Sequence, residues 1–178
     1  MSPRPAPYAV RLARPSDLRH LAAIEDAGGA LFEGLWGDLG GDPLTEPPPT
    51  GGHRADRPGF LLVAGDPVVG FVHVLEIEGA AHLEQLSVHP DAMRQGVGTA
   101  LVRAALEEAR WAGHEELSLC TYRDVPWNGP FYRRLGFTEV EDPEPWQRRL
   151  REHETALGLD RHGPRVVMRV ALGRPAGT

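Results

Sequence analysis

The sequence has no lysine, a single cysteine and no long hydrophobic run. All 19 residues in the combined count of lysine and arginine are arginines. This excludes a P-loop, because that motif places a lysine after its last glycine. The one cysteine, Cys120, excludes an internal disulfide and suits a reducing cytoplasm. No apolar run approaches the roughly 20 residues that a membrane helix needs, so no membrane-spanning segment is expected.

Metal ligands and targeting signals are also scarce. The eight histidines are scattered, without a metal-type spacing such as HxxxH or CxxC, so no metal site is expected. Residues 1–7 do not resemble a signal peptide, which again predicts a cytoplasmic protein. The formal net charge of −6 disfavours nucleic acid and anionic membrane as partners. A homodimer is compatible with all of these features.

What is present is typical of one globular domain. A chain of 178 residues, 41% hydrophobic and 25% charged, can bury a substantial core. Prolines near the start predict a disordered tail over residues 1–7. A single domain is then expected over 8–172, with its cofactor-binding core at about 81–140, and a second tail over 173–178.

The rest of the chain is organised around residues 81–137. Residues 81–88 are apolar and β-branched enough for a strand, which His89-Pro90 ends because proline has no amide donor. A glycine loop then opens an amphipathic helix that contains Leu101, Val102 and Ala105 on one face. Residues 117–121 form the next strand. A right-handed crossover would place the two strands in parallel.

The glycine loop lies at a helix N-terminus, where free amides and the helix dipole attract phosphate. Gly96 and Gly98 leave room for a pyrophosphate to approach the backbone. A Rossmann loop is disfavoured because its third glycine position holds Leu101, and because Glu115 and Glu116 precede the next strand instead of ending it. A plain glycine turn before a helix remains the alternative.

These segments, with V-H-P, Q-G-V-G-T-A-L and F-Y-R-R-L-G-F, resemble the acetyl-CoA-binding core of the GNAT superfamily of N-acetyltransferases. The resemblance is sharp over about residues 81–140. It implies an α/β (α+β) fold, in which helices flank a central mixed, mostly antiparallel sheet with a splayed parallel strand pair. It also implies an enzyme that transfers the acetyl group of acetyl-CoA to a primary amine of a small molecule or peptide, by direct attack in a ternary complex.

The resemblance implies two cofactor-binding segments. In the family, the pantetheine arm pairs with exposed strand backbone in the gap between the splayed strands. The corresponding positions here are Leu86, Ser87 and Val88. The family's phosphate loop corresponds to Arg94, Gln95, Gly96, Val97, Gly98 and Thr99, although Met93 stands where arginine or glutamine is usual.

The same resemblance implies two catalytic side chains. Tyr132 stands where the family's general acid usually lies, close to the thioester sulfur; a core aromatic is the alternative. Glu84 stands where many members carry a glutamate base; an edge or cross-strand charge is the alternative. Direct proton transfer from an alkylamine to an ordinary glutamate is uphill by about 8 kcal/mol. Either burial raises the pKa of Glu84, or a water path carries the proton to solvent.

Two further side chains each have a structural and a functional interpretation. Asn128 is expected to cap the helix after it, and cofactor contact is the alternative. Cys120 is expected to be a buried structural thiol, and an acyl-accepting nucleophile is the alternative.

Patterns in the flanking segments predict further strands and helices, with weaker signals than those of residues 81–137. Strands are expected at 8–13, 60–64, 68–77, 137–141 and 164–172, and helices at 15–29, 30–39 and 144–158. The first helix is expected to end at Gly28-Gly29. Residues 40–59 read as a long loop, either a lid or binding loop or else a surface insertion.

The resemblance places the acceptor site in about residues 25–59. This region has an acidic excess and apolar side chains, which would attract a cationic amine. The alternative is a solvated acidic loop. The residues concerned are Glu25, Asp26, Glu33, Asp38, Asp42, Glu46 and Asp56 against Arg54 and Arg57, with Phe32, Leu35 and Trp36. Two other function classes also stay open: a non-catalytic acyl-CoA-binding module, and an interaction protein built on the same fold.

Overall fold

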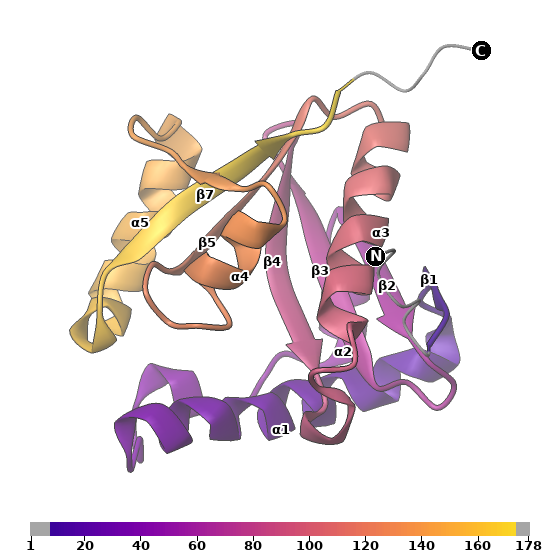
Figure 1. The fold of residues 1–178 in the computed structure, drawn as a ribbon, viewed down its shortest axis with the longest axis horizontal. Coiled ribbons are helices and arrows are strands. Elements are labelled where there is room, and N and C mark those ends of the chain that lie inside the picture. Colours follow the sequence, from indigo (N-terminus) through magenta and orange to yellow (C-terminus); the bar gives the residue numbers. More distant parts are fainter. Residues whose placement is uncertain (1–7, 174–178) are drawn as a thin grey trace.

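The computed structural model describes residues 8–173, which form a seven-stranded mixed sheet with helices on both faces (Figure 1). The strand order is β1-β2-β3-β4-β5-β7-β6, and β4 and β5 form the parallel pair. The predicted mixed, mostly antiparallel sheet is confirmed. The strands are β1 (Val10–Leu12), β2 (Gly59–Ala64), β3 (Gly70–Ile77), β4 (Ala80–Val88), β5 (Glu116–Tyr122), β6 (Thr138–Glu139) and β7 (Arg165–Ala171).

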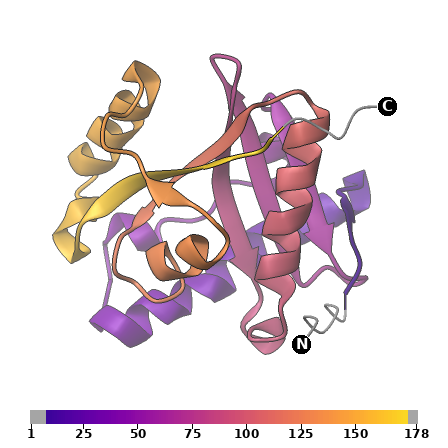
Figure 2. The ribbon, with the colours of Figure 1, turned by 45° about the horizontal axis from the view of Figure 1, so that its top comes forward.

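Two packed layers cover the sheet. The buried side of α3, with Leu101, Val102 and Ala105, packs on one face, and Leu21 and Ile24 of α1 pack on the other. Figure 2 shows α3 lying along the sheet and α5 at the opposite end of the molecule, with β7 running from the α5 side toward the end of α3. The α-helices are α1 (Leu18–Trp36), α2 (Gly51–Ala55), α3 (Val97–Trp111), α4 (Gly129–Arg134) and α5 (Pro145–Ala156); the 3-10 helices are η1 (Pro15–Asp17), η2 (Pro43–Thr45), η3 (Pro90–Ala92) and η4 (Leu159–His162).

The parallel strands diverge soon after they pair. Their register runs from Ala81 opposite Leu117 to Leu83 opposite Leu119, and Figure 1 shows β4 and β5 separating beyond that point. A β-bulge follows at once: His73 of β3 faces Gln85 and Val74 faces Leu83. Glu84 is therefore the extra residue of the bulge, and the alternation of side chains is reset after it.

Several predicted boundaries are wrong. The helix expected to end at Gly28-Gly29 continues to Trp36, so no separate helix covers 30–39. Gly28 lies against β4, because a Cβ there would be 3.9 Å from the Val88 carbonyl oxygen. Packing of this kind outweighs the helix propensity cost of about 1 kcal/mol per glycine.

The segment expected to be a long loop, 40–59, contains η2 and α2. The strand expected at 137–141 is reduced to β6, and the helix expected at 144–158 is α5. The tail predicted at 1–7, and the one at 173–178 apart from Gly173, lie outside the described residues. Within residues 8–173, no helix is long and apolar enough to cross a membrane.

Candidate functional site

The loop before α3 presents free backbone amides at the surface. Arg94 (φ 59°) and Gly96 (φ 81°) adopt left-handed conformations, and Arg94, Gln95 and Gly96 are exposed. The first hydrogen bond of the helix runs from the Ala100 amide to the Gly96 carbonyl. The amides of the three preceding residues thus have no acceptor within the helix. A Cβ at Gly96 would meet nothing within 4 Å, so this surface has room for a phosphate group.

The neighbouring part of β4 lacks a strand partner on the β5 side. Leu86, Ser87 and Val88 pair with β3, whereas the β4–β5 pairing has ended at Leu83. Leu86 and Val88 pack toward the core beneath α3, and Ser87 is buried. The other edge of this segment is open to an extended ligand, which could pair with it as a strand does.

Helix α4 closes the region from the other side. A Cβ at Gly98 would lie 3.6 Å from the Phe131 ring and 3.9 Å from Val88, so the start of α3, the end of β4 and α4 meet at one place. Gly129 lets α4 start here, because a Cβ would lie 2.2 Å from the Arg123 carbonyl oxygen. The elements predicted to hold the cofactor are therefore brought together.

Tyr132 lies on α4 within the core that contains Leu83, Val97 and Leu119, and is 7% exposed. Burial raises the pKa of its hydroxyl above the ordinary value. Within the described part of the chain, the fully enclosed side-chain nitrogens and oxygens without a hydrogen-bond partner are Arg54 Nε and His73 Nε2. The Tyr132 hydroxyl is not among them and makes no side-chain hydrogen bond there, so it is not sealed from solvent.

Glu84 lies in a charged network under β4. Its Oε2 accepts a hydrogen bond of 2.6 Å from Arg54 Nη1 and lies 3.3 Å from His73 Nδ1. Arg54 Nη2 donates to Glu25 Oε2. Arg54, on α2, therefore bridges a carboxylate of α1 and a carboxylate of β4; these three side chains are called the Arg54 bridge below.

Of the two alternatives considered for Glu84, a pKa raised by burial is contradicted. Burial alone would raise it, but hydrogen bonds from His73 and Arg54, together with the charge of Arg54, lower it to about 2. Glu25 shows the reverse balance, since burial raises the pKa of its carboxyl against the opposing effect of Arg54. Of the two alternatives for Glu84, the water path remains.

Asn128 occupies the N-cap position of α4, but its side chain makes no capping hydrogen bond. Its backbone carbonyl accepts from the Tyr132 amide at 3.0 Å. The expected side-chain cap is therefore wrong, and the amide group is not committed to α4.

Cys120 lies on β5 between buried neighbours. Burial raises the pKa of its thiol to about 12, so thiolate is scarce at neutral pH. This agrees with the expected structural role and disfavours a nucleophile.

An aromatic cluster joins the end of α1 to the end of β5. The Phe32 ring stacks on Trp36 at 5.2 Å and lies 5.6 Å from Trp127. Trp36 contacts Tyr122 edge-on at 5.1 Å and stacks on His162 at 4.6 Å. Phe32 and Trp36, expected beside the acceptor site, therefore pack with aromatic side chains from later in the chain.

Two acidic residues of the 25–59 region are held in ion pairs. Asp42 is buried, with Oδ2 2.7 Å from His162 Nε2, and Glu25 is held by Arg54. Sequence reasoning treated Arg54 as one charge of a loop and missed His73. No local signal identifies them, because Arg54 stands 29 and 30 residues from Glu25 and Glu84 in the chain.

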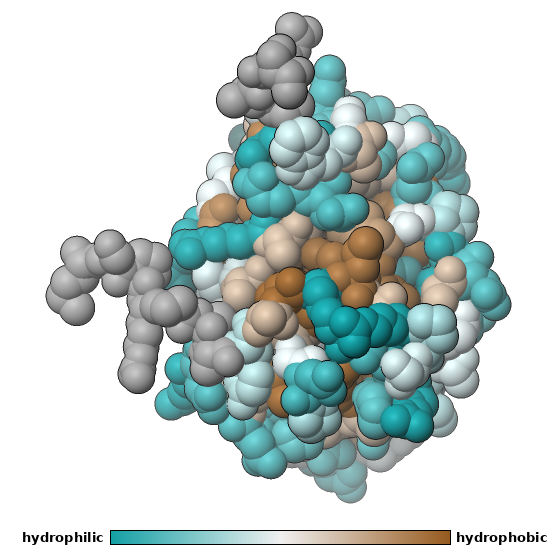
Figure 3. Space-filling view, turned by 90° about the vertical axis from the view of Figure 1, so that its right-hand side faces the viewer, coloured by the Kyte–Doolittle hydropathy of each residue, from teal (hydrophilic) through white to brown (hydrophobic). Residues whose placement is uncertain are grey.

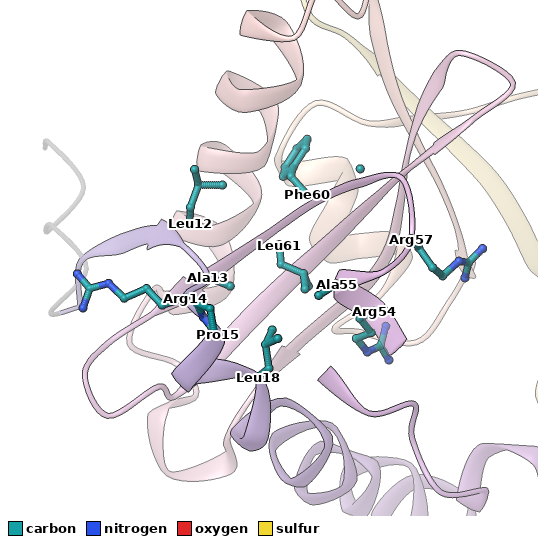
Figure 4. A pocket seen from close by; sticks show the side chains of 11 residues that line it. Leu12, Ala13, Arg14, Pro15, Leu18, Arg54, Ala55, Arg57, Phe60 and Leu61 are labelled. Atoms are coloured by element: carbon teal, nitrogen blue, oxygen red, sulfur yellow. The ribbon is translucent and has the colours of Figure 1, made fainter. Parts of the chain in front are cut away.

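A separate cavity of about 330 Å³ opens between β1, β2 and α2 (Figure 4). It has an apolar floor that includes Leu18, Phe60 and Leu61, with Arg57 beside it. The side of the molecule that carries β1 shows hydrophobic surface among polar groups (Figure 3), and Leu12 of β1 is 55% exposed. None of the predicted cofactor or catalytic residues lines this cavity. No group of three or more potential metal ligands occurs among residues 8–173.

Comparisons with known proteins agree with this architecture. Residues 57–139 match the family described as acetyltransferase (GNAT) domain. An uncharacterized N-acetyltransferase of Methanocaldococcus jannaschii is 33% identical over 107 residues, which cover 55% of this chain and 47% of that protein. The chain thus spans about half the length of this curated relative.

Solved structures share the fold at low sequence identity. PaiA N-acetyltransferase from Thermoplasma acidophilum, solved in complex with coenzyme A, has a TM-score of 0.65 and 15% identity, with coverage of 92% of this chain and 98% of that one. The ribosomal-protein-S18-alanine N-acetyltransferase from Escherichia coli has a TM-score of 0.63 and 18% identity, with 96% of each chain covered. The predicted fold is confirmed.

Proposed function

We propose that the chain, of which residues 57–139 match the acetyltransferase (GNAT) domain family, is an acetyl-CoA-dependent N-acetyltransferase acting on a primary amine of a small molecule or peptide. One observation carries the proposal: the open edge of β4, the free amides at the start of α3, and Tyr132 on α4 converge where the parallel strands diverge. The coenzyme A in the Thermoplasma acidophilum relative supports the same ligand class.

The residues around this place fit a thioester cofactor with a long arm and a pyrophosphate. The backbone of Leu86, Ser87 and Val88 is placed to pair with an extended arm. The amides of Val97, Gly98 and Thr99 are placed for the phosphates, with exposed Arg94 adding positive charge. Asn128 has an uncommitted amide group for a further contact. Acetyl-CoA, when bound, supplies an activated acyl group.

We assign Tyr132 to protonation of the departing thiolate. An ordinary tyrosine is a weaker acid than a thiol by about 1.5 pKa units, a cost of about 2 kcal/mol. Burial raises the pKa of Tyr132. Because the same apolar surroundings would also disfavour a thiolate formed next to Tyr132, the difference in pKa between the two groups stays small.

Glu84 is assigned to the proton path of the amine without acting as its direct base. A carboxyl with a pKa of about 2 differs from an alkylamine by about 8 units, or about 11 kcal/mol. Direct transfer is therefore too costly. Glu84 stays ionised and can accept hydrogen bonds from the ammonium group and from water that takes the proton to solvent.

Direct attack by the amine is favoured over an acyl-enzyme. The chain's one cysteine is poorly ionised at neutral pH, since burial raises its pKa to about 12. Transfer then requires both substrates on the protein at once.

The experiment combines acetyl-CoA with a panel of primary amines and detects the released thiol and the mass of the acetylated amine. Calorimetry of acetyl-CoA binding accompanies it. Binding with transfer supports the proposal. Binding without transfer to any amine would indicate an acyl-CoA-binding module, and absence of binding would overturn both assignments.

A further inference from the structure

The Arg54 bridge joins three elements through one buried cation. Arg54 is 2% exposed, while the side chains of Glu25 and Glu84 are 20% and 32% exposed. With histidine counted as neutral, two carboxylates and one guanidinium leave a net charge of −1. This excess negative charge lies on the two partly exposed carboxylates, where a cationic group can approach it.

The carboxylates retain bonding capacity. Glu25 and Glu84 each contact Arg54 through Oε2, and a carboxylate has two oxygens that accept hydrogen bonds. Because Arg54 itself is enclosed, a ligand can reach the exposed parts of the two carboxylates but not the cation between them. An approaching group therefore meets negative charge.

The polar groups of the network are also short of partners. Arg54 Nε and His73 Nε2 are both fully enclosed without a hydrogen-bond partner in the described part of the chain. His73 is 1% exposed, and its other ring nitrogen lies 3.2 Å from Arg54 Nη1. Enclosed polar atoms of this kind usually have a partner, so the bridge is a polar network that is not fully satisfied by the protein's own groups.

The α1 surface beside Glu25 is open toward the diverging strands. At helical spacing, Glu25 shares a face with Gly28, Gly29 and Phe32. A Cβ at Gly28 would be 3.9 Å from the Val88 carbonyl oxygen, and one at Gly29 would meet nothing within 4 Å. Gly28 thus brings this face of α1 against the end of β4, and Gly29 leaves space between a carboxylate and an aromatic ring.

We propose that Glu25 and Glu84, aligned by Arg54, bind the ammonium group of the acetyl acceptor, and that the site selects amines without a carboxylate next to the amino group. This rests on the proposed function and names its substrate class. Charge-assisted hydrogen bonds from an ammonium would balance the net charge of −1. An adjacent carboxylate on the ligand would instead meet Glu25 or Glu84 at close range and be repelled. Arg54 is a positioning residue in this arrangement, since it acts through the two carboxylates.

The test compares norvalinamide with norvaline, which differ in an amide against a carboxylate beside the same amino group. Transfer is measured as kcat/KM for the unprotonated fraction of each amine, because a carboxylate raises the pKa of the amino group next to it more than an amide does. Binding is measured by calorimetry on protein saturated with coenzyme A. We expect wild type to favour the amide by about 10- to 100-fold, the size of one charged hydrogen bond.

The decisive variant is Glu25→Gln, because glutamine still offers an oxygen to Arg54 but removes one charge. It should bring the two acceptors to within a few-fold of each other, mainly through KM. Glu152→Gln is the matched control: Glu152 is exposed on α5, outside the acceptor region, and its loss should leave the preference unchanged. Arg54→Lys keeps the positive charge and should retain part of the preference for norvalinamide over norvaline. Arg54→Met removes the charge and should abolish this preference.

The outcomes separate this inference from the proposed function. Transfer to both acceptors with equal kcat/KM in wild type, or an unchanged preference in a folded Glu25→Gln variant, would overturn the inference alone. If no amine is acetylated, calorimetry still decides it: tighter binding of norvalinamide that depends on Glu25 supports the site. Failure of both ligands to bind wild type would overturn it.

Discussion

A buried glutamate does not become a strong base when its neighbours donate hydrogen bonds to it. Glu84 combines burial, which opposes its charge, with Arg54 and His73, which favour it, and the hydrogen bonds prevail. Glu25 contacts the same guanidinium, and there burial prevails. One cation thus leaves two carboxylates with opposite pKa shifts, because Glu84 also accepts a hydrogen bond from His73, whereas Glu25 has Arg54 alone against burial and the charge of Glu84.

This difference predicts how stability depends on pH in the Glu84→Gln variant. The folded pKa of Glu84 is about 2 against an ordinary value of 4.5, so its contribution is complete above about pH 4.5 and declines as pH falls toward 2. Wild type should therefore have the higher Tm at pH 6, and the gap should narrow steadily between pH 4.5 and 2. Thermal unfolding followed across this range checks it. A gap that does not change with pH would contradict the lowered pKa.

Tyr132→Phe removes the proposed acid while keeping the ring that packs in the core. Affinity for acetyl-CoA should stay near wild type, and turnover should fall by about 10²- to 10⁴-fold. Single-turnover kinetics measures the chemical step directly. The control is Tyr8→Phe, since Tyr8 packs near Gly65 in a different part of the sheet and should leave turnover intact. An unchanged rate of the chemical step in Tyr132→Phe would show that Tyr132 has only a structural role.

At the scale of elements, local signals predicted best where one segment determines its own structure. The strand, glycine loop and helix from Ala80 to Trp111 follow from proline, glycine and 3.6-residue periodicity, and the structure reproduces them. The α1 boundary was missed because a glycine pair normally ends a helix, whereas contact with β4 and an aromatic cluster extends this one. Likewise, Arg54 could not be assigned, since its partners come from α1 and β4.

The geometry of the loop before α3 predicts that Gly96 is needed for tight binding of acetyl-CoA. Gly96→Ala places a methyl group where the free amides face solvent, so acetyl-CoA should bind more weakly, by about 10-fold or more. The substitution also strains a left-handed residue by about 1–2 kcal/mol. Gly113→Ala supplies the matched control, since Gly113 has φ +91° and open space at the other end of α3. Calorimetry should show weaker binding in Gly96→Ala only, although both variants lose similar stability.

The contact between α1 and α2 predicts opposite effects for neighbouring glycines. A Cβ at Gly51 would lie 2.1 Å from the Leu18 carbonyl oxygen, whereas one at Gly52 would be 3.9 Å from its nearest neighbour. Gly51→Ala should therefore lower the free energy of unfolding by about 1–3 kcal/mol, because α2 must move. Gly52→Ala should leave it unchanged or raise it by up to about 1 kcal/mol. Denaturant unfolding of both variants measures the difference, and equal effects would show that α2 is not held against α1.

At the scale of the whole molecule, two open places lie on different parts of the sheet. The diverging strands meet the start of α3, whereas the apolar cavity lies between β1, β2 and α2. Arg54 contributes to both places. Its guanidinium lies in the Arg54 bridge, and the residue also lines the apolar cavity. The net charge of −6 surrounds both with a negative field on average.

The negative field of the protein predicts that added salt lowers kcat/KM for a cationic acceptor amine. A cationic amine should approach an anionic protein faster than a neutral one, and added salt should screen this attraction. With acetyl-CoA saturating, kcat/KM for an alkylamine should fall between about 0.02 M and about 0.5 M salt, since the Debye length shortens several-fold over that range. An arylamine, uncharged at pH 7, is the control and should change little. Pairing of Asp42 with His162 and of Glu25 with Arg54 limits the expected effect to a few-fold. Equal salt dependence for both amines would show that the contacts of the Arg54 bridge, rather than the field of the whole molecule, govern acceptor binding.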